Sequence, residues 1–358
     1  MSLKITNRLQ KLRQKLAEKK IDGIFVSQPE NRYYLSGFNG SSGYLLITPQ
    51  NAVLATDFRY LEQAKGQAPD YQIFRITNNT ADWFPRLVSE TDLSRLAFEA
   101  KDITFALYRQ LSDILDKARS RLQLVPEDGL VESVRAVKEP EEIELITRAA
   151  AITDSAFAYI EDTIRIGMTE KEVAWEIEKF LREHSSQSLP FDVIVASGPN
   201  SALPHARPSQ RQIKAGESVI IDIGARVKGY GSDLTRTICP GGSDDTFKKV
   251  YDTVLRAQLT ALDVIKEGIS GEEADSVARA VIEEAGYGEA FGHALGHGVG
   301  LATHEQPHLG PTSTALLTEG MVFTIEPGIY LAGWGGVRIE DLVVMENGKI
   351  RVISKTGK

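Results

Sequence analysis

The fold of the second half of the chain is decided by SVIIDIGARVKGYGSDLTRTI at 218–238 and MVFTIEPGIYLAGWGGVRIEDLVV at 321–344. In both stretches short apolar runs alternate with glycine-rich turns, which is typical of strands paired in antiparallel hairpins. Because residues on both alternating faces of the runs are apolar, we expect the strands to be buried on both sides. Carboxylates buried in such strands need a cation. Four of them interrupt the runs in two pairs, Asp222 with Asp233 and Glu326 with Glu340.

The midpoints of the two acid pairs fall at turns. The first pair is centred on residues 227–228, beside Gly229, and the second pair is centred on Gly333. We therefore expect the acids of each pair to face each other, with Cβ atoms ~4.5 to 5.5 Å apart, where like charges destabilise a hairpin. Two such clashes indicate a two-metal site, in which carboxylates flank ions ~3.5 to 4 Å apart. The alternative is that these acids lie on solvent-facing strand positions.

A histidine-rich and glycine-rich segment, GHALGHGVGLATHEQPH at 292–308, holds four of the six histidines. His297 lies between two glycines, which permit close backbone approach, so its side chain can reach a crowded metal centre. His304 and His205 are candidates for hydrogen bonds to a substrate carbonyl or a tetrahedral intermediate. His184 is expected at an exposed helix end without a role. A single imidazole among four carboxylates favours Mn²⁺, with Co²⁺, Fe²⁺ or Zn²⁺ as alternatives.

Composition limits the possible partners. The net charge of −8 and the lack of a Lys/Arg block argue against nucleic acid and anionic lipid as partners. No segment approaches ~18 uninterrupted apolar residues, so we expect no membrane span. The only cysteine, Cys239, excludes an intrachain disulfide framework and fits a cytoplasmic location.

The length of 358 residues predicts two domains. Helical spacing of Ile5, Leu9, Leu12 and Leu16 precedes a series of short strand-like and helical runs, which indicates an α/β domain at 1–136. The alternation stops near Pro140, where an alanine-rich helix begins. Local hairpins then predict an α+β domain with a largely antiparallel sheet at 137–358.

With these acids and histidines, the chain resembles the pita-bread metallopeptidases, which include aminopeptidase P, prolidase and methionine aminopeptidase, with creatinase as a metal-free relative. The first domain resembles the creatinase/prolidase N-terminal domain, including NRYYLSGF at 31–38. Methionine aminopeptidases lack that domain and are disfavoured. The resemblance implies a creatinase/prolidase-like N-terminal domain followed by a pita-bread catalytic domain.

The resemblance also implies a site. Glu326 would both ligate metal and take a proton from the attacking water, while His205 and His304 would steady the scissile carbonyl. His293 and Arg338 match positions that line the substrate pocket, and Thr235 matches one that hydrogen-bonds near the metals. Five residues match the ligands of two divalent ions: Asp222, Asp233, His297, Glu326 and Glu340.

The resemblance further implies that the substrates are proline-containing peptides, cleaved before the proline. Prolidases of this type tend to carry an arginine after the HExP segment, where this chain has His308. The difference favours an Xaa-Pro aminopeptidase acting on longer peptides, with an Xaa-Pro dipeptidase as the alternative. A non-catalytic peptide-binding module and a metal-free creatinase-type hydrolase are the less favoured possibilities. A homodimer is expected by analogy with the family.

Overall fold

The computed structural model describes residues 3–89, 91–184 and 186–358. The chain divides into two compact units, Met1–Arg135 and Ala136–Lys358, which are described separately. None of the described helices is both long and apolar enough to cross a bilayer.

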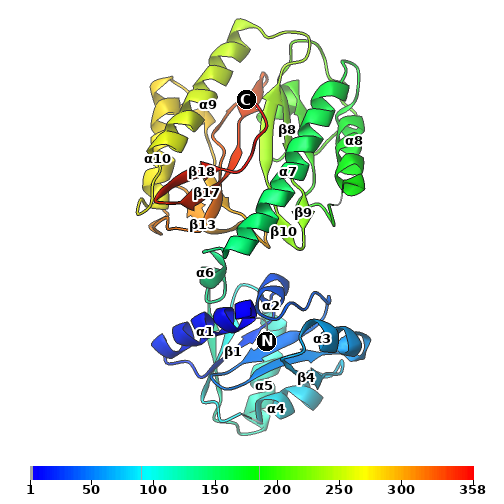
Figure 1. The fold of residues 1–358 in the computed structure, drawn as a ribbon, viewed down its shortest axis with the longest axis vertical. Helices are drawn as coiled ribbons and strands as arrows, with labels where there is room; N and C mark the ends of the chain where they lie inside the picture. The colour runs from blue at the N-terminus through cyan, green and yellow to red at the C-terminus, as the bar shows by residue number, and fades with distance from the viewer. Residues whose placement is uncertain (1–2, 90, 185) are drawn as a thin grey trace. The chain divides into compact units, whose positions relative to one another are not determined.

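The first unit is built on a mixed six-stranded sheet in the order β4-β3-β2-β1-β5-β6 (Figure 1). β1 pairs antiparallel with β2 and parallel with β5, so the unit is α/β as predicted. Its elements are α1 (Leu3–Glu18), β1 (Gly23–Val26), α2 (Pro29–Ser36), β2 (Tyr44–Ile47), β3 (Ala52–Thr56), η1 (Phe58–Tyr60), α3 (Leu61–Gln67), β4 (Gln72–Arg75), α4 (Thr80–Ser89), β5 (Arg95–Glu99), α5 (Phe105–Lys117), β6 (Gln123–Glu127) and α6 (Glu132–Arg135).

Apolar periodicity explains the core of this unit. Leu9, Leu12 and Leu16 recur at helical spacing and are almost fully buried on α1. All four residues of β1 are buried, as expected for a central strand of a sheet. The strand β6 was not predicted, because its sequence QLVPE contains a proline and lies partly exposed at the sheet edge.

The second unit surrounds antiparallel strands with two helix pairs. In Figure 1, α7 and α8 lie on one side of the strands and α9 and α10 on the other. This α+β arrangement agrees with the prediction. Its elements are α7 (Pro140–Thr163), α8 (Glu170–Glu183), β7 (Ile194–Ser197), η2 (Gly198–Ala202), β8 (Val219–Ile223), β9 (Arg226–Val227), β10 (Tyr230–Gly231), β11 (Leu234–Ile238), α9 (Asp245–Val264), α10 (Gly271–Glu284), η3 (Gly288–Ala290), β12 (Gly296–Gly298), β13 (Glu305–Leu309), β14 (Val322–Ile325), β15 (Gly328–Leu331), β16 (Gly335–Arg338), β17 (Asp341–Glu346) and β18 (Lys349–Val352).

Local signals determine where these helices begin. Pro140 is the first residue of α7, where its missing N–H leaves no intrahelical bond unmade. Thr169 caps α8 by accepting a hydrogen bond from the backbone N–H of Glu172, whose carboxylate accepts one from the backbone N–H of Thr169. The same reciprocal capping box occurs between Ser270 and Glu273 at α10.

The register of the two acidic hairpins agrees with the prediction in one case and differs in the other. In the second, Ile325 pairs with Asp341 and Gly328 pairs with Arg338, which places the two glutamates opposite each other. In the first, Asp222 pairs with Thr235 instead of Asp233.

The cause of this difference is the turn. Val227 pairs with Tyr230, so Lys228 and Gly229 form a two-residue turn, and both have positive φ, 48° and 86°. Such type I′ turns match the twist of a hairpin and set its register. The shift is two positions, which keeps Asp222 and Asp233 on the same face as diagonal neighbours.

Candidate active site

The five acid and histidine positions lie at the ends or centres of neighbouring strands. Asp222 is on β8, and Asp233 directly precedes β11, which pairs with β8. The other three come from the second sheet region: His297 at the centre of β12, Glu326 directly after β14, and Glu340 between β16 and β17.

The glycines beside His297 allow the strands to approach. A Cβ at Gly296 would lie 2.0 Å from the carbonyl oxygen of Thr324, and one at Gly298 would lie 2.2 Å from that of Gln306. Only glycine permits these backbone contacts. The sequence GHG thus allows β12, which carries His297, to fit between β13 and β14.

The side chains converge. His297 Nε2 is 3.3 Å from Glu326 Oε1 and 3.7 Å from Asp233 Oδ2. Asp233, His297 and Glu340 each offer one ligand atom, and these atoms all lie within 4.8 Å of one another, so the three could hold a metal ion. This mixture of oxygen and imidazole ligands suits a divalent transition metal.

Asp222 is held beside this group by Arg338, whose Nη2 donates to Asp222 Oδ2 over 2.6 Å. The other oxygen, Oδ1, is buried and has no hydrogen-bond partner among the described residues. Native proteins rarely leave a buried polar atom unsatisfied, so this oxygen fits the role of a cation ligand.

Burial, together with the crowding of like charges, shifts the pKa values of the clustered acids. Burial, followed by the charges of neighbouring carboxylates, raises the pKa of Asp233 and of Glu340 well above the usual range. Burial also raises the pKa of Asp222, although Arg338 opposes the shift. Burial alone would raise the pKa of Glu326, but the hydrogen bond and positive charge of His297 lower it to about 2. Without a cation, this cluster retains protons that a bound cation would displace.

Several hydrogen-bonding residues hold the acids in place. Thr235 Oγ1 donates to Glu340 Oε2 at 2.6 Å and accepts from Arg338 Nε at 3.1 Å. Thr324 Oγ1 donates to Glu326 Oε1 at 2.9 Å and accepts from the backbone N–H of His297 at 3.0 Å. Thr235 was predicted near the acids, whereas Thr324 was missed. Period-two alternation on β14, which places Thr324 on the same face as Glu326, could have identified it.

Tyr330 is a second residue that sequence reasoning missed. Its hydroxyl accepts from Arg338 Nη1 at 2.9 Å and lies 2.9 Å from His293 Nε2. It pairs with Gly336 on the neighbouring strand, a register that follows from the turn centred on Gly333. That register could have identified Tyr330 as a neighbour of Arg338.

The remaining histidines lie around the acids. The rings of His304 and His297 have centroids 4.1 Å apart. Partial burial, followed by the positive charges of His297 and His205, lowers the pKa of His304. His205 is exposed on the segment after η2. His308 is exposed on β13 and pairs with His297, which directs the two side chains to the same face.

Two further histidines have simpler surroundings. Burial, as the largest cause, lowers the pKa of His293, favouring the neutral imidazole beside Tyr330. His184 is exposed at the C-terminus of α8 and stacks on Phe180, in agreement with the expectation of a helix end.

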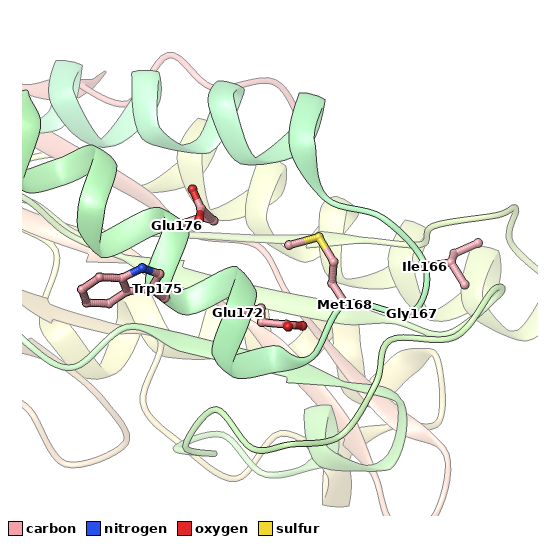
Figure 2. A pocket seen from close by; sticks show the side chains of 6 residues that line it. All are labelled: Ile166, Gly167, Met168, Glu172, Trp175 and Glu176. Atoms are coloured by element: carbon pink, nitrogen blue, oxygen red, sulfur yellow. The ribbon is translucent and has the colours of Figure 1, made fainter.

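A separate pocket lies at the α7–α8 connection (Figure 2). Trp175, Glu172 and Glu176 project from α8, and Met168 lies beside them. The pocket is lined by Ile166, Gly167, Met168, Glu172, Trp175 and Glu176. These residues include no histidine and none of the clustered acids, so the acid–histidine cluster is the better candidate for chemistry.

Comparison with known proteins identifies the family of the chain. Residues 144–347 match metallopeptidase family M24, and residues 8–137 match the creatinase/prolidase N-terminal domain. The chain belongs to metallopeptidase family M24. It is therefore a peptidase with the creatinase N-terminal domain and the pita-bread catalytic domain that the sequence predicted.

The relatives are named for two related activities. An Xaa-Pro dipeptidase from Pyrococcus furiosus is 36% identical, over 98% of both chains. The solved structure of an Xaa-Pro dipeptidase from Bacillus anthracis is 42% identical, with a TM-score of 0.94 over 99% of this chain and 98% of the other. An X-Pro aminopeptidase structure from Thermotoga maritima is 37% identical, with a TM-score of 0.85 over 94% and 96%. Of these two solved structures, the Xaa-Pro dipeptidase is more similar to the chain in sequence identity and TM-score than the aminopeptidase, the activity that position 308 favoured.

Proposed function

We propose that the chain is an Xaa-Pro dipeptidase that uses two divalent metal ions, most favourably Mn²⁺. The observation that carries the proposal is the convergence of four buried or nearly buried carboxylates on His297, with one carboxylate oxygen of Asp222 left without a partner among the described residues. The catalytic unit is proposed as 137–358, and 1–136 as the N-terminal domain.

The proposed ligands are those named by the family resemblance. Together Asp222, Asp233, His297, Glu326 and Glu340 would hold the two ions. Such a pair of ions would polarise the scissile carbonyl and activate water at neutral pH. Four carboxylates balance the charge of two divalent cations, which would remove the repulsion among the acids.

Protein groups would supply the remaining steps. Glu326, whose Oε1 lies 3.3 Å from His297 Nε2, would accept a proton from the attacking water. The neutral imidazole of His304 and the exposed His205 are suited to hydrogen-bond the substrate carbonyl oxygen. His293 and Arg338 are linked through Tyr330 and would form the wall of the substrate pocket.

A second candidate is an Xaa-Pro aminopeptidase that accepts longer peptides. His308 favours it, because an imidazole holds a dipeptide's carboxylate less firmly than a bidentate arginine would. The Thermotoga maritima relative supports this candidate as well. A cytoplasmic homodimer is proposed by analogy with the family.

The deciding experiment compares an Xaa-Pro dipeptide with an Xaa-Pro-Yaa tripeptide after Mn²⁺ loading, using wild type and His308→Arg. A dipeptidase hydrolyses the dipeptide with the higher kcat/KM. The substitution should raise this preference about tenfold or more if position 308 faces the substrate carboxylate. Hydrolysis of the tripeptide alone would contradict the proposal in favour of the aminopeptidase.

A further inference from the structure

A buried acid outside the metal cluster lies at the start of α8. Glu170 is the first residue of this helix and has 0% exposure. It does not belong to the metal-binding group, and the chemistry proposed above does not use it. A carboxylate is stable in such a place only when hydrogen bonds satisfy its oxygens.

Its two oxygens bind two segments of chain that lie on either side of His205. Oε1 accepts from the backbone N–H and the hydroxyl of Ser197, at 2.7 and 2.8 Å. Oε2 accepts from the backbone N–H and the hydroxyl of Ser209, at 3.0 and 2.6 Å. Asn200 Nδ2 reaches both oxygens at 3.1 Å. One carboxylate therefore joins the two ends of residues 198–208, here called the His205 loop.

The helix start supports the same end of this loop. The backbone N–H groups of Glu170 and Lys171 donate to the carbonyls of Arg211 and Ser209, both over 3.1 Å. The carboxylate then extends from this paired segment to Ser197, at the end of β7. Glu170 is thus the link between α8 and both ends of the loop.

The His205 loop rests directly on a strand of the candidate active site. Ser201 Oγ accepts from the backbone N–H of Gly336 on β16 at 2.8 Å, and the Pro204 carbonyl accepts from Arg338 Nη1 at 3.3 Å. Two side chains of this loop, Leu203 and His205, are exposed. Any change in how the loop closes would move His205 relative to Arg338.

We infer that Glu170 is a positioning residue for His205, holding the His205 loop closed so that the imidazole faces the substrate. This inference rests on the proposed function for the role of His205. Glu170 would not touch the substrate. Its effect would pass through the geometry of the loop, where a displacement of about 1 Å can reduce a rate about a hundredfold.

The test uses Glu170→Gln, in which an amide NH₂ replaces one acceptor and faces the donors of one end of the loop. Glu172→Gln is the matched control, because Glu172 lies in the same helical turn and its carboxylate bonds only the Thr169 cap among the contacts described. His205→Ala and the double variant Glu170→Gln/His205→Ala complete a thermodynamic cycle. Ser209→Ala, which removes a single hydroxyl, replaces Glu170→Gln if that variant does not fold.

Two measurements are made on each variant: amide hydrogen exchange of residues 196–210, and kcat and KM for an Xaa-Pro dipeptide with Mn²⁺. We expect Glu170→Gln to speed exchange in the loop and to lower kcat about tenfold, with KM changed by less than about twofold. Glu172→Gln should leave both within about twofold. On the His205→Ala background, Glu170→Gln should lower kcat by less than about twofold.

An equal loss of kcat on the wild-type and His205→Ala backgrounds would overturn the inference, because Glu170 would then act independently of His205. Unchanged exchange in the loop would also overturn it. A wild-type protein that leaves Xaa-Pro peptides intact would instead overturn the proposed function. The hydrogen-exchange data would then test only whether Glu170 holds the His205 loop closed.

Discussion

At the scale of single residues, the acid cluster stores repulsion that a cation would relieve. Asp233 is only 5% exposed. Burial, followed by the charges of Glu340, Asp222 and Glu326, raises the pKa of Asp233. Changing Asp233 to Asn removes the cost of burying an ionisable acid among other acids and keeps the shape of the side chain, so the metal-free protein should be as stable as wild type or more stable. The same change should weaken Mn²⁺ binding.

Thermal unfolding with and without Mn²⁺ measures both effects. For wild type, Mn²⁺ at a hundred times its Kd should add about 2.7 kcal/mol per bound ion to the free energy of unfolding. Asp233→Asn should lose most of this gain, whereas Asp245→Asn, an exposed control, should keep it. An equal Mn²⁺ effect in Asp233→Asn would show that Asp233 does not bind the ion.

The charged residues of the candidate site could be predicted from the sequence, whereas the residues that hold them in place could not. Buried acids in apolar strands and a histidine between glycines are visible as local patterns. Tyr330 and Thr324 are not, because a tyrosine or threonine in a strand is ordinary and acquires meaning only from its cross-strand partner. Glu170 was hidden for the same reason: acids are common in the first turn of a helix, where they favour the helix dipole.

At the scale of elements, turn chemistry decided what could be predicted. For the hairpin centred on Gly333, the predicted register is the observed one, because the glycine-rich turn has a single centre. At Lys228 the register was wrong by two positions, because a lysine at positive φ does not announce a type I′ turn. Face alternation survived the error, which explains why the candidate site could still be assembled from the sequence.

The histidine–glycine segment gives a matched test of element packing. Gly296→Ala places a Cβ 2.0 Å from the Thr324 carbonyl oxygen, whereas a Cβ at Gly292 meets nothing within 4 Å. We expect Gly296→Ala to lower the free energy of unfolding by about 2 kcal/mol or more and to reduce kcat by displacing His297. Gly292→Ala should change stability by less than about 0.5 kcal/mol. Urea unfolding and dipeptide hydrolysis measure both, and equal effects would refute the packing argument.

At the scale of the whole molecule, each unit has its own hydrophobic core. Because each core buries different ionisable groups, we expect the free energy of unfolding of each unit to depend on pH in its own way. In the first unit, Glu99 accepts hydrogen bonds from the backbone N–H groups of Ser27 and Gln28, yet burial, as the dominant cause, raises its pKa to about 7. Folding therefore favours the protonated acid. Its stabilising contribution is fully present below about pH 4.5 and is lost as the pH rises through about 7.

This pH dependence can be observed in the first unit alone. Trp83 is its only tryptophan, so a variant with Trp175→Phe and Trp334→Phe reports its unfolding by fluorescence. Between pH 5 and 8 the free energy of unfolding should fall on the order of 2 kcal/mol, and Glu99→Gln should flatten the curve. Identical pH profiles with and without Glu99 would contradict the assignment.

The central claim is that the acid–histidine cluster is a metal centre that cleaves Xaa-Pro bonds. The most direct measurement is the rate of Xaa-Pro dipeptide hydrolysis before chelation, after removal of metal by chelator and dialysis, and after return of Mn²⁺. The account predicts loss of activity on chelation and recovery with Mn²⁺ at about two ions per chain. Hydrolysis that survives complete metal removal, or that never appears with Mn²⁺ bound, would contradict it.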